Sequence, residues 1–212
     1  MKRTLFFFLL FIGSFMAILH FGGHLLENES PTLNDKAGDP DIHLENTKRY
    51  ANEHAFDRSM YHLEKAIQTI RIIEEDADVY SGEILEKTID ELLNLKVELA
   101  TNTLSSDDLN AAIYNALNAL TMVELRISES YAETNKLKKA KIAMKYGLLH
   151  LEHSMPYSKG SLRKKEVEIY NEIDSMLTSE SLYSIDVTFK LSDLITELDS
   201  LLKENQFNTL NN

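Results

Sequence analysis

Three histidines are the side chains in this sequence whose type and spacing best fit metal chemistry. His150 and His153 are three positions apart, so they would lie on one side of a helix. His62 precedes a Leu-Glu pair just as His150 does, and imidazole is the commonest metal ligand in proteins. One interpretation is a transition-metal site for Zn or Cu, made by His62, His150 and His153 if their helices pack face to face. The other is that they are boundary residues with ordinary hydrogen bonds, because His62 and His150 fall at the edge of an apolar stripe.

The histidines belong to a longer internal match. Residues 55–67 resemble residues 143–155 at a constant offset of 88 positions, so that small, apolar and His-Leu-Glu positions coincide. Two further segments, 89–93 and 113–120, resemble 173–177 and 191–198 in the same order. We expect two duplicated three-helix units, at about 48–132 and 135–205, and chance similarity between helical stripes is the alternative. Small side chains at Ser59 and Gly147 would let the two units approach closely.

No combination of residues reaches a catalytic signature. The sequence has no His-Glu-x-x-His pattern, no Gly-x-Ser-x-Gly pattern and no phosphate-binding glycine loop. Because it contains no cysteine, it has neither the acylation site of a lipoprotein nor the pairs of a disulfide scaffold. We therefore assign no catalytic residue and expect a protein that is not an enzyme.

Basic residues are concentrated in one part of an acidic chain. The formal net charge is −12, yet residues 136–165 hold nine Lys and Arg against the single acid Glu152. The net charge argues against binding of nucleic acid. The basic region would either bind an acidic partner or balance acidic helices of the same fold. The residues that we expect to contact a partner are Lys136, Lys138, Lys139, Lys141, Lys145, Arg163, Lys164 and Lys165.

The amino-terminal residues predict a membrane segment. Lys2 and Arg3 are followed by an uncharged apolar run, and residues 4–23 would span about 30 Å as a helix. The two cations predict a single-pass anchor in the cell membrane, with the amino terminus in the cytoplasm and the body outside. A cleaved signal peptide, which would leave a secreted or periplasmic protein, is the alternative. Residues 24–47 contain Pro31, Gly38 and Pro40 and are predicted to be a flexible spacer.

From residue 48 onward, apolar residues recur at helical spacing. Helices are predicted over about 48–75, 82–102, Ser106 to Tyr131, 135–155, 161–178 and 184–203, before a polar tail at 206–212. Residues 183–191 alternate as a strand would, but a lone strand has no partner. Because no Gly or Pro lies between Leu109 and Tyr146, one helix over 107–155 is an alternative to two. The expected fold class is all-α, a six-helix bundle or array over 48–205.

Two functions are consistent with these features. The first is a non-catalytic, membrane-anchored extracytoplasmic helical domain, which binds a protein or another envelope component and needs no cofactor. The second is a helical bundle in the same compartment that binds a transition metal through its histidines.

Overall fold

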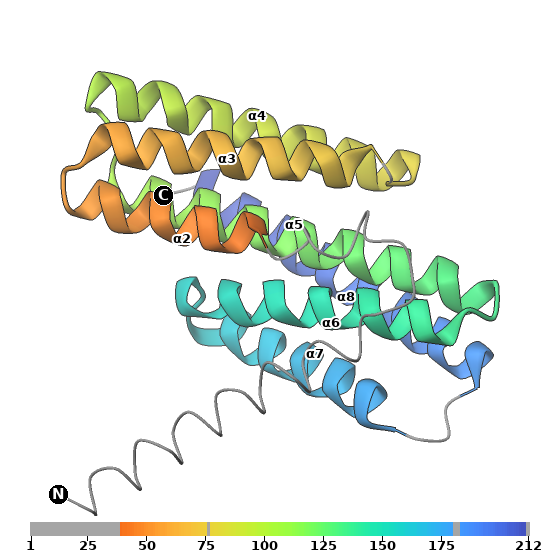
Figure 1. Ribbon diagram of the computed structural model, residues 1–212. Helices are drawn as coiled ribbons and strands as arrows, with labels where there is room; N and C mark the ends of the chain where they lie inside the picture. The colour runs from red at the N-terminus through yellow and green to blue at the C-terminus, as the bar shows by residue number, and fades with distance from the viewer. Residues whose placement is uncertain (1–38, 76, 180–182, 211–212) are drawn as a thin grey trace, which may run out of the picture. The chain divides into compact units, whose positions relative to one another are not determined.

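The computed structural model describes residues 39–75, 77–179 and 183–210, with side chains as far as Lys203. These residues form helices and contain no strand, so the predicted all-α class and helical bundle are confirmed (Figure 1). The α-helices are α2 (Asp39–Asn52), α3 (Phe56–Glu74), α4 (Val79–Thr101), α5 (Ser106–Glu133), α6 (Leu137–Ser154), α7 (Gly160–Thr178) and α8 (Ser184–Leu210). A short 3-10 helix, η2 (Met155–Tyr157), follows α6.

The predicted anchor at residues 1–23 lies outside the described residues. Among the helices that are described, none is both long and apolar enough to cross a membrane. The segment with strand-like alternation at 183–191 lies largely in α8. That helix extends to Leu210, so most of the predicted polar tail is helical.

The start of the folded body was predicted incorrectly. Residues 39–47, expected to be spacer, belong to α2, and the single helix expected over 48–75 is divided between α2 and α3. Pro40 is compatible with the first turn of α2, because the backbone N–H that proline lacks has no helical partner at that position. The division between the helices is at His54, whose φ of 56° ends the right-handed helix.

The alternative of one helix over 107–155 is also wrong. Asn135 has a φ of 57°, a left-handed conformation that Asn adopts more readily than most residues. The Lys136 N–H then donates to the Tyr131 carbonyl at 2.8 Å, which satisfies a carbonyl at the end of α5. The chain therefore turns back after α5 without needing a glycine or proline.

Helix α5 is shared by two hydrophobic cores (Figure 1). One core is formed by α2, α3, α4 and one face of α5, and the other by a different face of α5 with α6, α7 and α8. The α5 side chains Ile113, Leu117 and Leu120 pack in the first core, whereas Met122 and Leu125 pack in the second. With 28 residues, α5 extends about 42 Å, which is long enough to serve both.

Ser59 and Gly147 each lie at a close contact between helices, but not with each other. Each contacts the helix that precedes its own in the chain. The Ser59 hydroxyl of α3 donates to the Thr47 carbonyl of α2 at 2.8 Å. A Cβ at Gly147 of α6 would lie 3.4 Å from Leu125 Cδ2 and 3.5 Å from the Thr121 carbonyl oxygen, both of α5. The expected close contact at Ser59 and Gly147 thus occurs within two helical hairpins, α2–α3 and α5–α6.

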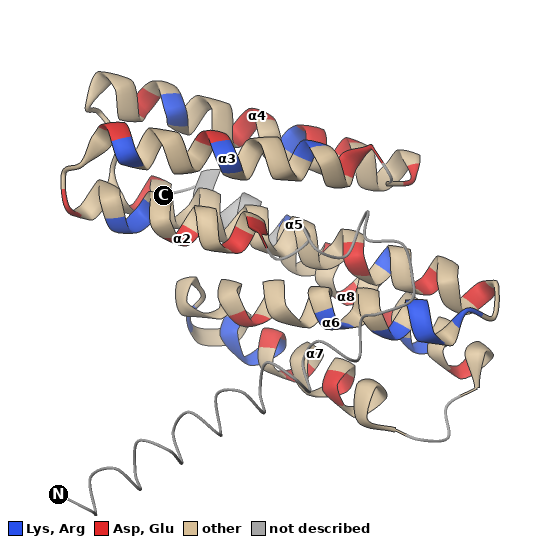
Figure 2. Cartoon of the chain, viewed as in Figure 1, with Lys and Arg blue, Asp and Glu red and all other residues tan. Residues whose placement is uncertain are grey.

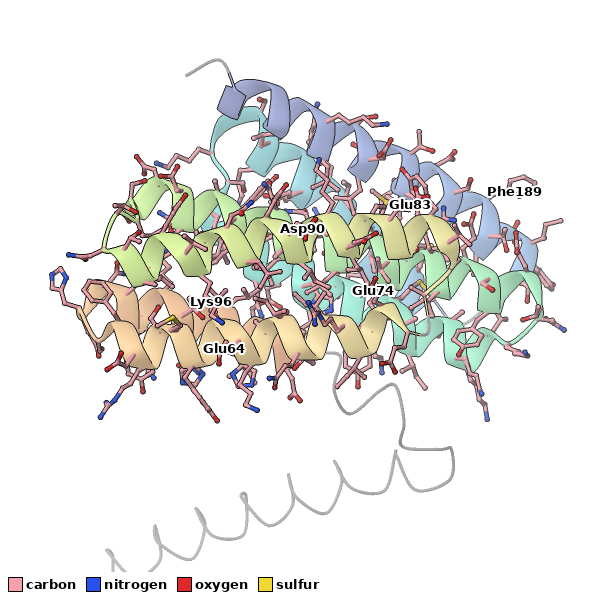
Figure 3. The ribbon with its side chains drawn as sticks, turned by 90° about the horizontal axis from the view of Figure 1, so that it is seen from above. Glu64, Glu74, Glu83, Asp90, Lys96 and Phe189 are labelled. Atoms are coloured by element: carbon pink, nitrogen blue, oxygen red, sulfur yellow. The ribbon has the colours of Figure 1, made fainter. Side chains whose placement is uncertain are left out.

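Charged side chains occur along all of the labelled helices (Figure 2). One ion pair joins neighbouring helices of the first core, since Lys96 Nζ of α4 lies 2.7 Å from Glu64 Oε1 of α3 (Figure 3). Both side chains are substantially exposed, so this pair contributes at most about 1 kcal/mol to stability.

Candidate functional site

The eight basic residues predicted to bind a partner are divided between two helices, α6 and α7. Lys136, Lys138, Lys139 and Lys141 lie at the start of α6 and Lys145 at its middle, whereas Arg163 to Lys165 lie at the start of α7. Helix α6 has 18 residues and is about 27 Å long. Because the two helices run antiparallel, about one helix length separates the groups.

Several of these cations are engaged within the fold. Lys141 Nζ donates to the carbonyl oxygens of Leu177 at 3.3 Å and Ser179 at 2.9 Å, which caps the end of α7. In the α7 group, Lys164 pairs with Glu168 at 3.8 Å, while Arg163 and Lys165 are half-buried. One Arg163 guanidinium nitrogen, Nη1, is fully buried. Lys141 and Arg163 are thus engaged within the fold, whereas Lys164 is exposed and has a distant carboxylate partner.

Four lysines remain open: Lys136, Lys138 and Lys139 at the start of α6, and Lys145 at its middle, are exposed. In the described part of the chain, none of the four forms an ion pair with a carboxylate. Lys136 and Lys139 instead place their ammonium groups 6.0 and 5.8 Å from the centre of the Tyr131 ring. Pairing with acidic helices of the same fold therefore does not account for these four cations.

The structure places the predicted metal-binding histidines in two separate clusters. His150 Nδ1 and His153 Nδ1 lie 2.6 and 2.7 Å from the two carboxylate oxygens of Asp41, a residue of α2. His62 Nδ1 lies 3.1 Å from His43 Nδ1. Since Asp41 and His43 are two positions apart in α2, their side chains point about 200° apart around its axis.

His62 is thus on a different side of α2 from His150 and His153. Within the described residues, no group of three or more His, Cys, Asp or Glu side chains is arranged to hold a metal ion.

The Asp41 cluster is a buried charged network. Burial by itself would raise the pKa of Asp41, but the charge of His150 and hydrogen bonds from both histidines hold it below its ordinary value. The hydrogen bond to Asp41 raises the pKa of His153. An ionised Asp41 accepts a hydrogen bond from the Nδ1–H of each histidine, so Nε2 is the ring nitrogen of each that does not contact Asp41. His150 Nε2 is fully buried and has no hydrogen-bond partner among the described residues.

Glu124 of α5 is a further ionisable group of this network. Its side chain is buried, and burial raises its pKa to about 7, although the charge of His150 opposes the rise. Glu124 therefore adds a group of α5 to those of α2 and α6, and its protonation changes near neutral pH.

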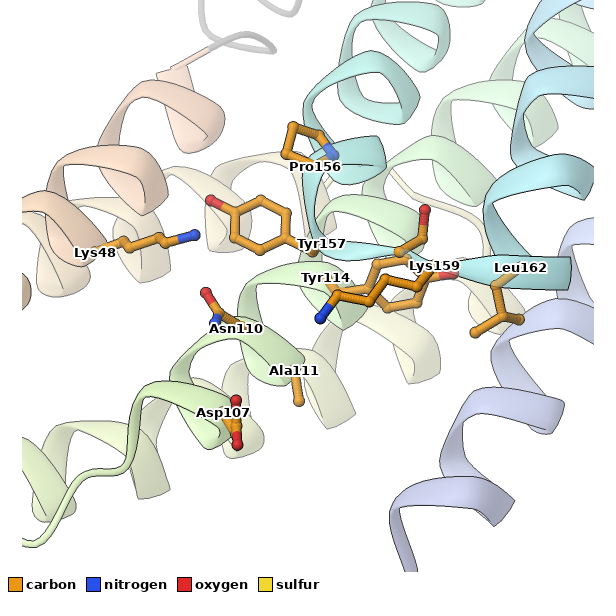
Figure 4. A pocket seen from close by; sticks show the side chains of 10 residues that line it. Lys48, Asp107, Asn110, Ala111, Tyr114, Pro156, Tyr157, Lys159 and Leu162 are labelled. Atoms are coloured by element: carbon orange, nitrogen blue, oxygen red, sulfur yellow. The ribbon is translucent and has the colours of Figure 1, made fainter.

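Two cavities lie beside this network. A cavity of about 640 Å³ is lined by Asp41 and His153 with residues of α2, α5 and η2. A second, of about 410 Å³, extends toward Asn110, Tyr114 and Lys159 (Figure 4). Lys48 lines both, and its ammonium lies 4.2 Å from the centre of the Tyr157 ring.

These cavities do not bring together the parts of a nucleophilic site. Asp41 orients His153, as an acid orients the base of a catalytic triad. However, no hydroxyl among the described residues is hydrogen-bonded to the other ring nitrogen of His153. What the contacts show is that Asp41 links α2 to His150 and His153 of α6.

The sequence analysis missed the acidic residues at the centre of these contacts. Asp41 lay in the predicted spacer, and its only local signal was the Asp-Pro-Asp start of a helix. Glu166, which accepts hydrogen bonds from Ser154 at 2.8 Å and from Ser158, lies among the charged residues at the start of α7 and gave no signal. Both are buried carboxylates whose partners come from other helices or from the turn before α7.

Comparisons were made with protein-family models, with curated proteins and with solved structures, and none matches this chain. What the protein does is therefore inferred from its own residues.

Proposed function

We propose that this chain is a non-catalytic helical binding domain held at the outer face of a membrane by residues 4–23. Its contact surface would be the open lysines of α6, Lys136, Lys138, Lys139 and Lys145, and its partner an acidic protein or another acidic component of the envelope.

The observation that carries this proposal is the isolation of these four cations in an acidic protein. The helix dipole disfavours positive charge in the first turn of α6 by about 0.3–1 kcal/mol per group. Lys136, Lys138 and Lys139 bear this cost, and no carboxylate among the described residues offsets it. Four exposed lysines that do not stabilise the fold are well suited to contact an acidic partner.

The anchor rests on the amino-terminal sequence. Lys2 and Arg3 precede twenty residues without a charge, and Glu27 and Glu29 follow them. This asymmetry favours an amino terminus in the cytoplasm and a helical body outside. Residues 24–38 would connect the anchor to α2.

We further propose that the body arose by internal duplication, with α3 to α5 and α6 to α8 as the two copies. Ser59 and Gly147 occupy matched positions at the offset of 88, and each lies where its helix packs against the preceding helix. A shared packing position supports duplication more strongly than the sequence match does by itself.

The contact proposal is tested with two charge-reversed variants of the full chain. One carries Lys138→Glu and Lys145→Glu, and the control carries Lys159→Glu and Lys164→Glu, so both change the net charge equally. Crosslinking to the native envelope should be lost in the first variant and retained in the control. If both variants crosslink like the wild type, the assignment of the α6 lysines is overturned.

The anchor is tested by extracting native membranes with alkaline carbonate. An anchored chain stays in the membrane pellet with its amino terminus intact. Complete release of the chain, or an amino terminus near His24, would overturn the proposed anchor.

A further inference from the structure

Three large apolar side chains are exposed at the start of α8. Tyr183, Ile185 and Phe189 are 74%, 64% and 67% exposed, and Ile185 and Phe189 are four residues apart on one face. Phe189 projects away from the helical body (Figure 3). Such exposed aromatic and aliphatic groups near one another mark an interaction surface.

These apolar residues lie at the same end of the bundle as the open lysines. The Ser184 hydroxyl donates to Asn135 Oδ1 at 2.6 Å, which brings the start of α8 to the turn immediately before Lys136. Lys141, one turn into α6, reaches the carbonyl of Ser179. The basic and apolar side chains therefore belong to one end of the molecule, which we call the basic-aromatic end: Lys136, Lys138, Lys139, Tyr183, Ile185 and Phe189.

The direction of α2 shows on which side the chain enters the body. Asp41 contacts His150, and farther along α2 Lys48 contacts Tyr157, so α2 runs parallel to α6. The first residue of α2 therefore faces the end of the bundle at which α6 starts. Along α6, His150 is about 18 Å from Lys138.

The chain outside the described residues has a suitable length. Fifteen residues, 24–38, separate the proposed anchor from α2, and fifteen residues can reach at most about 50 Å. That reach exceeds the roughly 18 Å between the level of His150 and Lys138, so the length of the segment allows the basic-aromatic end to contact the bilayer.

We infer that the basic-aromatic end docks on a lipid surface rich in anionic headgroups. This inference rests on the membrane tether of the proposed function and names the envelope component that the lysines contact. Each lysine near an anionic bilayer strengthens binding about fivefold, so three strengthen it roughly 100-fold. Tyrosine and other aromatic side chains prefer the depth of the headgroups, where a polar tip meets an apolar body.

Anionic lipid is required because acidic groups also occur at this end. Glu133 and Asp186 are exposed in the elements that carry the basic-aromatic end. The three lysines outnumber these two acids. A zwitterionic bilayer would attract the lysines only weakly, whereas an anionic bilayer would attract them strongly. The tether adds to this contact, since it converts a weak encounter into an intramolecular one.

The experiment uses the absence of tryptophan from the chain. Full-length protein carrying Phe189→Trp is reconstituted in vesicles of phosphatidylcholine, with or without phosphatidylglycerol. We expect a blue-shifted emission and quenching by brominated lipid only where phosphatidylglycerol is present. Reversal of Lys136, Lys138 and Lys139 to Glu in the same variant should abolish both effects, and Tyr183→Trp should report the same change as Phe189→Trp.

The control variant is Val97→Trp, in the last turns of α4. Val97 is 62% exposed and lies near the turn between α4 and α5. The turn between α5 and α6, which precedes the open lysines, is at the other end of α5. Its emission should not respond to the lipid. If the emission of Phe189→Trp is as insensitive to phosphatidylglycerol as that of Val97→Trp, the inference is overturned. That result is expected if the partner is an acidic protein.

Flotation of the vesicles separates this failure from failure of the proposed function. Protein that floats with both kinds of vesicle but shows no lipid-dependent emission keeps its tether and refutes only the lipid contact. Protein that does not float with either kind refutes the tether.

Discussion

Asp41 Oδ1 lies 2.6 Å from His150 Nδ1, although 109 positions separate the two residues in the chain. Both side chains are completely buried, and the other oxygen of Asp41 accepts from His153. Through this carboxylate, α2 is attached to α6, a helix of the other core. In the interior such a pair fixes the relative position of the helices more than it adds net stability.

Removing the carboxylate charge should destabilise the protein strongly. Asp41→Asn leaves the two histidines with a neutral partner that can no longer accept from both rings. Loss of one member of a buried pair costs about 3–5 kcal/mol of the free energy of unfolding. Urea titration followed by circular dichroism measures this loss. Asp39→Asn is the matched control in the same helical turn, and it should cost no more than about 1 kcal/mol.

Equal effects of Asp41→Asn and Asp39→Asn would show that the Asp41 network does not hold α2 in place.

Glu124→Gln should change how stability depends on pH. The pKa of Glu124 is raised to about 7 by burial, whereas in the unfolded chain it is near 4.5. Between these values the folded state binds a proton that the unfolded state does not, so stability falls as pH rises from about 4.5 to about 7. Gln cannot ionise, so the variant should be about 3 kcal/mol more stable than the wild type at pH 8.

The two proteins should be similar in stability at pH 4, where Glu124 is protonated in both states. Urea titrations at pH 4, 6 and 8 would reveal the difference, and parallel profiles across this range would contradict the shifted pKa.

His153 adds a pH dependence of the same sign near neutrality. The hydrogen bond to Asp41 raises the pKa of His153 in the folded state. The stability that His153 contributes to the fold is therefore fully present below about pH 6.5, and it is lost as pH rises through the raised pKa. Asp41 acts at the acid end, because its lowered pKa stabilises the fold above about pH 3.8 and this stability is lost as pH falls through the folded value. Replacing His153 with Gln should therefore flatten the wild-type profile above pH 6.

Helices with a continuous apolar stripe were predictable from the sequence. The stripe from Leu109 to Tyr131 predicts α5 within a few residues of its ends, because packing on both cores follows the same 3.6-residue period. Helix α2 was missed because Pro40 and its acidic neighbours resemble a spacer. Its buried residues Leu44 and Thr47 give only a short stripe.

The contacts that define the candidate site could not be read from local spacing. The interval between His150 and His153 correctly places both on one side of α6, but the sequence does not state that Asp41 lies opposite them. That pairing depends on how α2 packs across α5 and α6, which is a long-range property. Likewise, the position at which α7 ends determines that Lys141 donates to its last carbonyls, whereas Lys138 stays exposed.

Lys141 and Lys138 should therefore respond differently to the same substitution. Lys141→Gln removes a charged donor from the carbonyls of Leu177 and Ser179, and should reduce stability by about 1 kcal/mol. Lys138→Gln removes one charge from an exposed side chain and should change stability by less than about 0.5 kcal/mol. Thermal unfolding of the two single variants tests this, and identical midpoints would mean that Lys141 does not cap α7.

Glycine substitutions test how closely α6 approaches α5. A Cβ at Gly147 would be 3.4–3.5 Å from Leu125, Glu124 and the Thr121 carbonyl, which are ordinary contact distances with no room beyond them. Gly147→Ala should therefore be neutral or slightly stabilising, since alanine favours the helix by up to about 1 kcal/mol. Gly147→Leu should lose about 1–3 kcal/mol or more, because its further atoms overpack the contact with α5.

Gly82 provides the control, because a Cβ there meets nothing within 4 Å. Gly82→Ala should raise the free energy of unfolding by about 0.5–1 kcal/mol, and Gly82→Leu should be similar, since both residues are good helix formers and neither meets a neighbour. Chemical denaturation of the four variants gives the comparison. If Gly147→Leu is tolerated as well as Gly82→Leu, α5 and α6 do not pack at this distance, and the proposed equivalence of Ser59 and Gly147 loses its structural support.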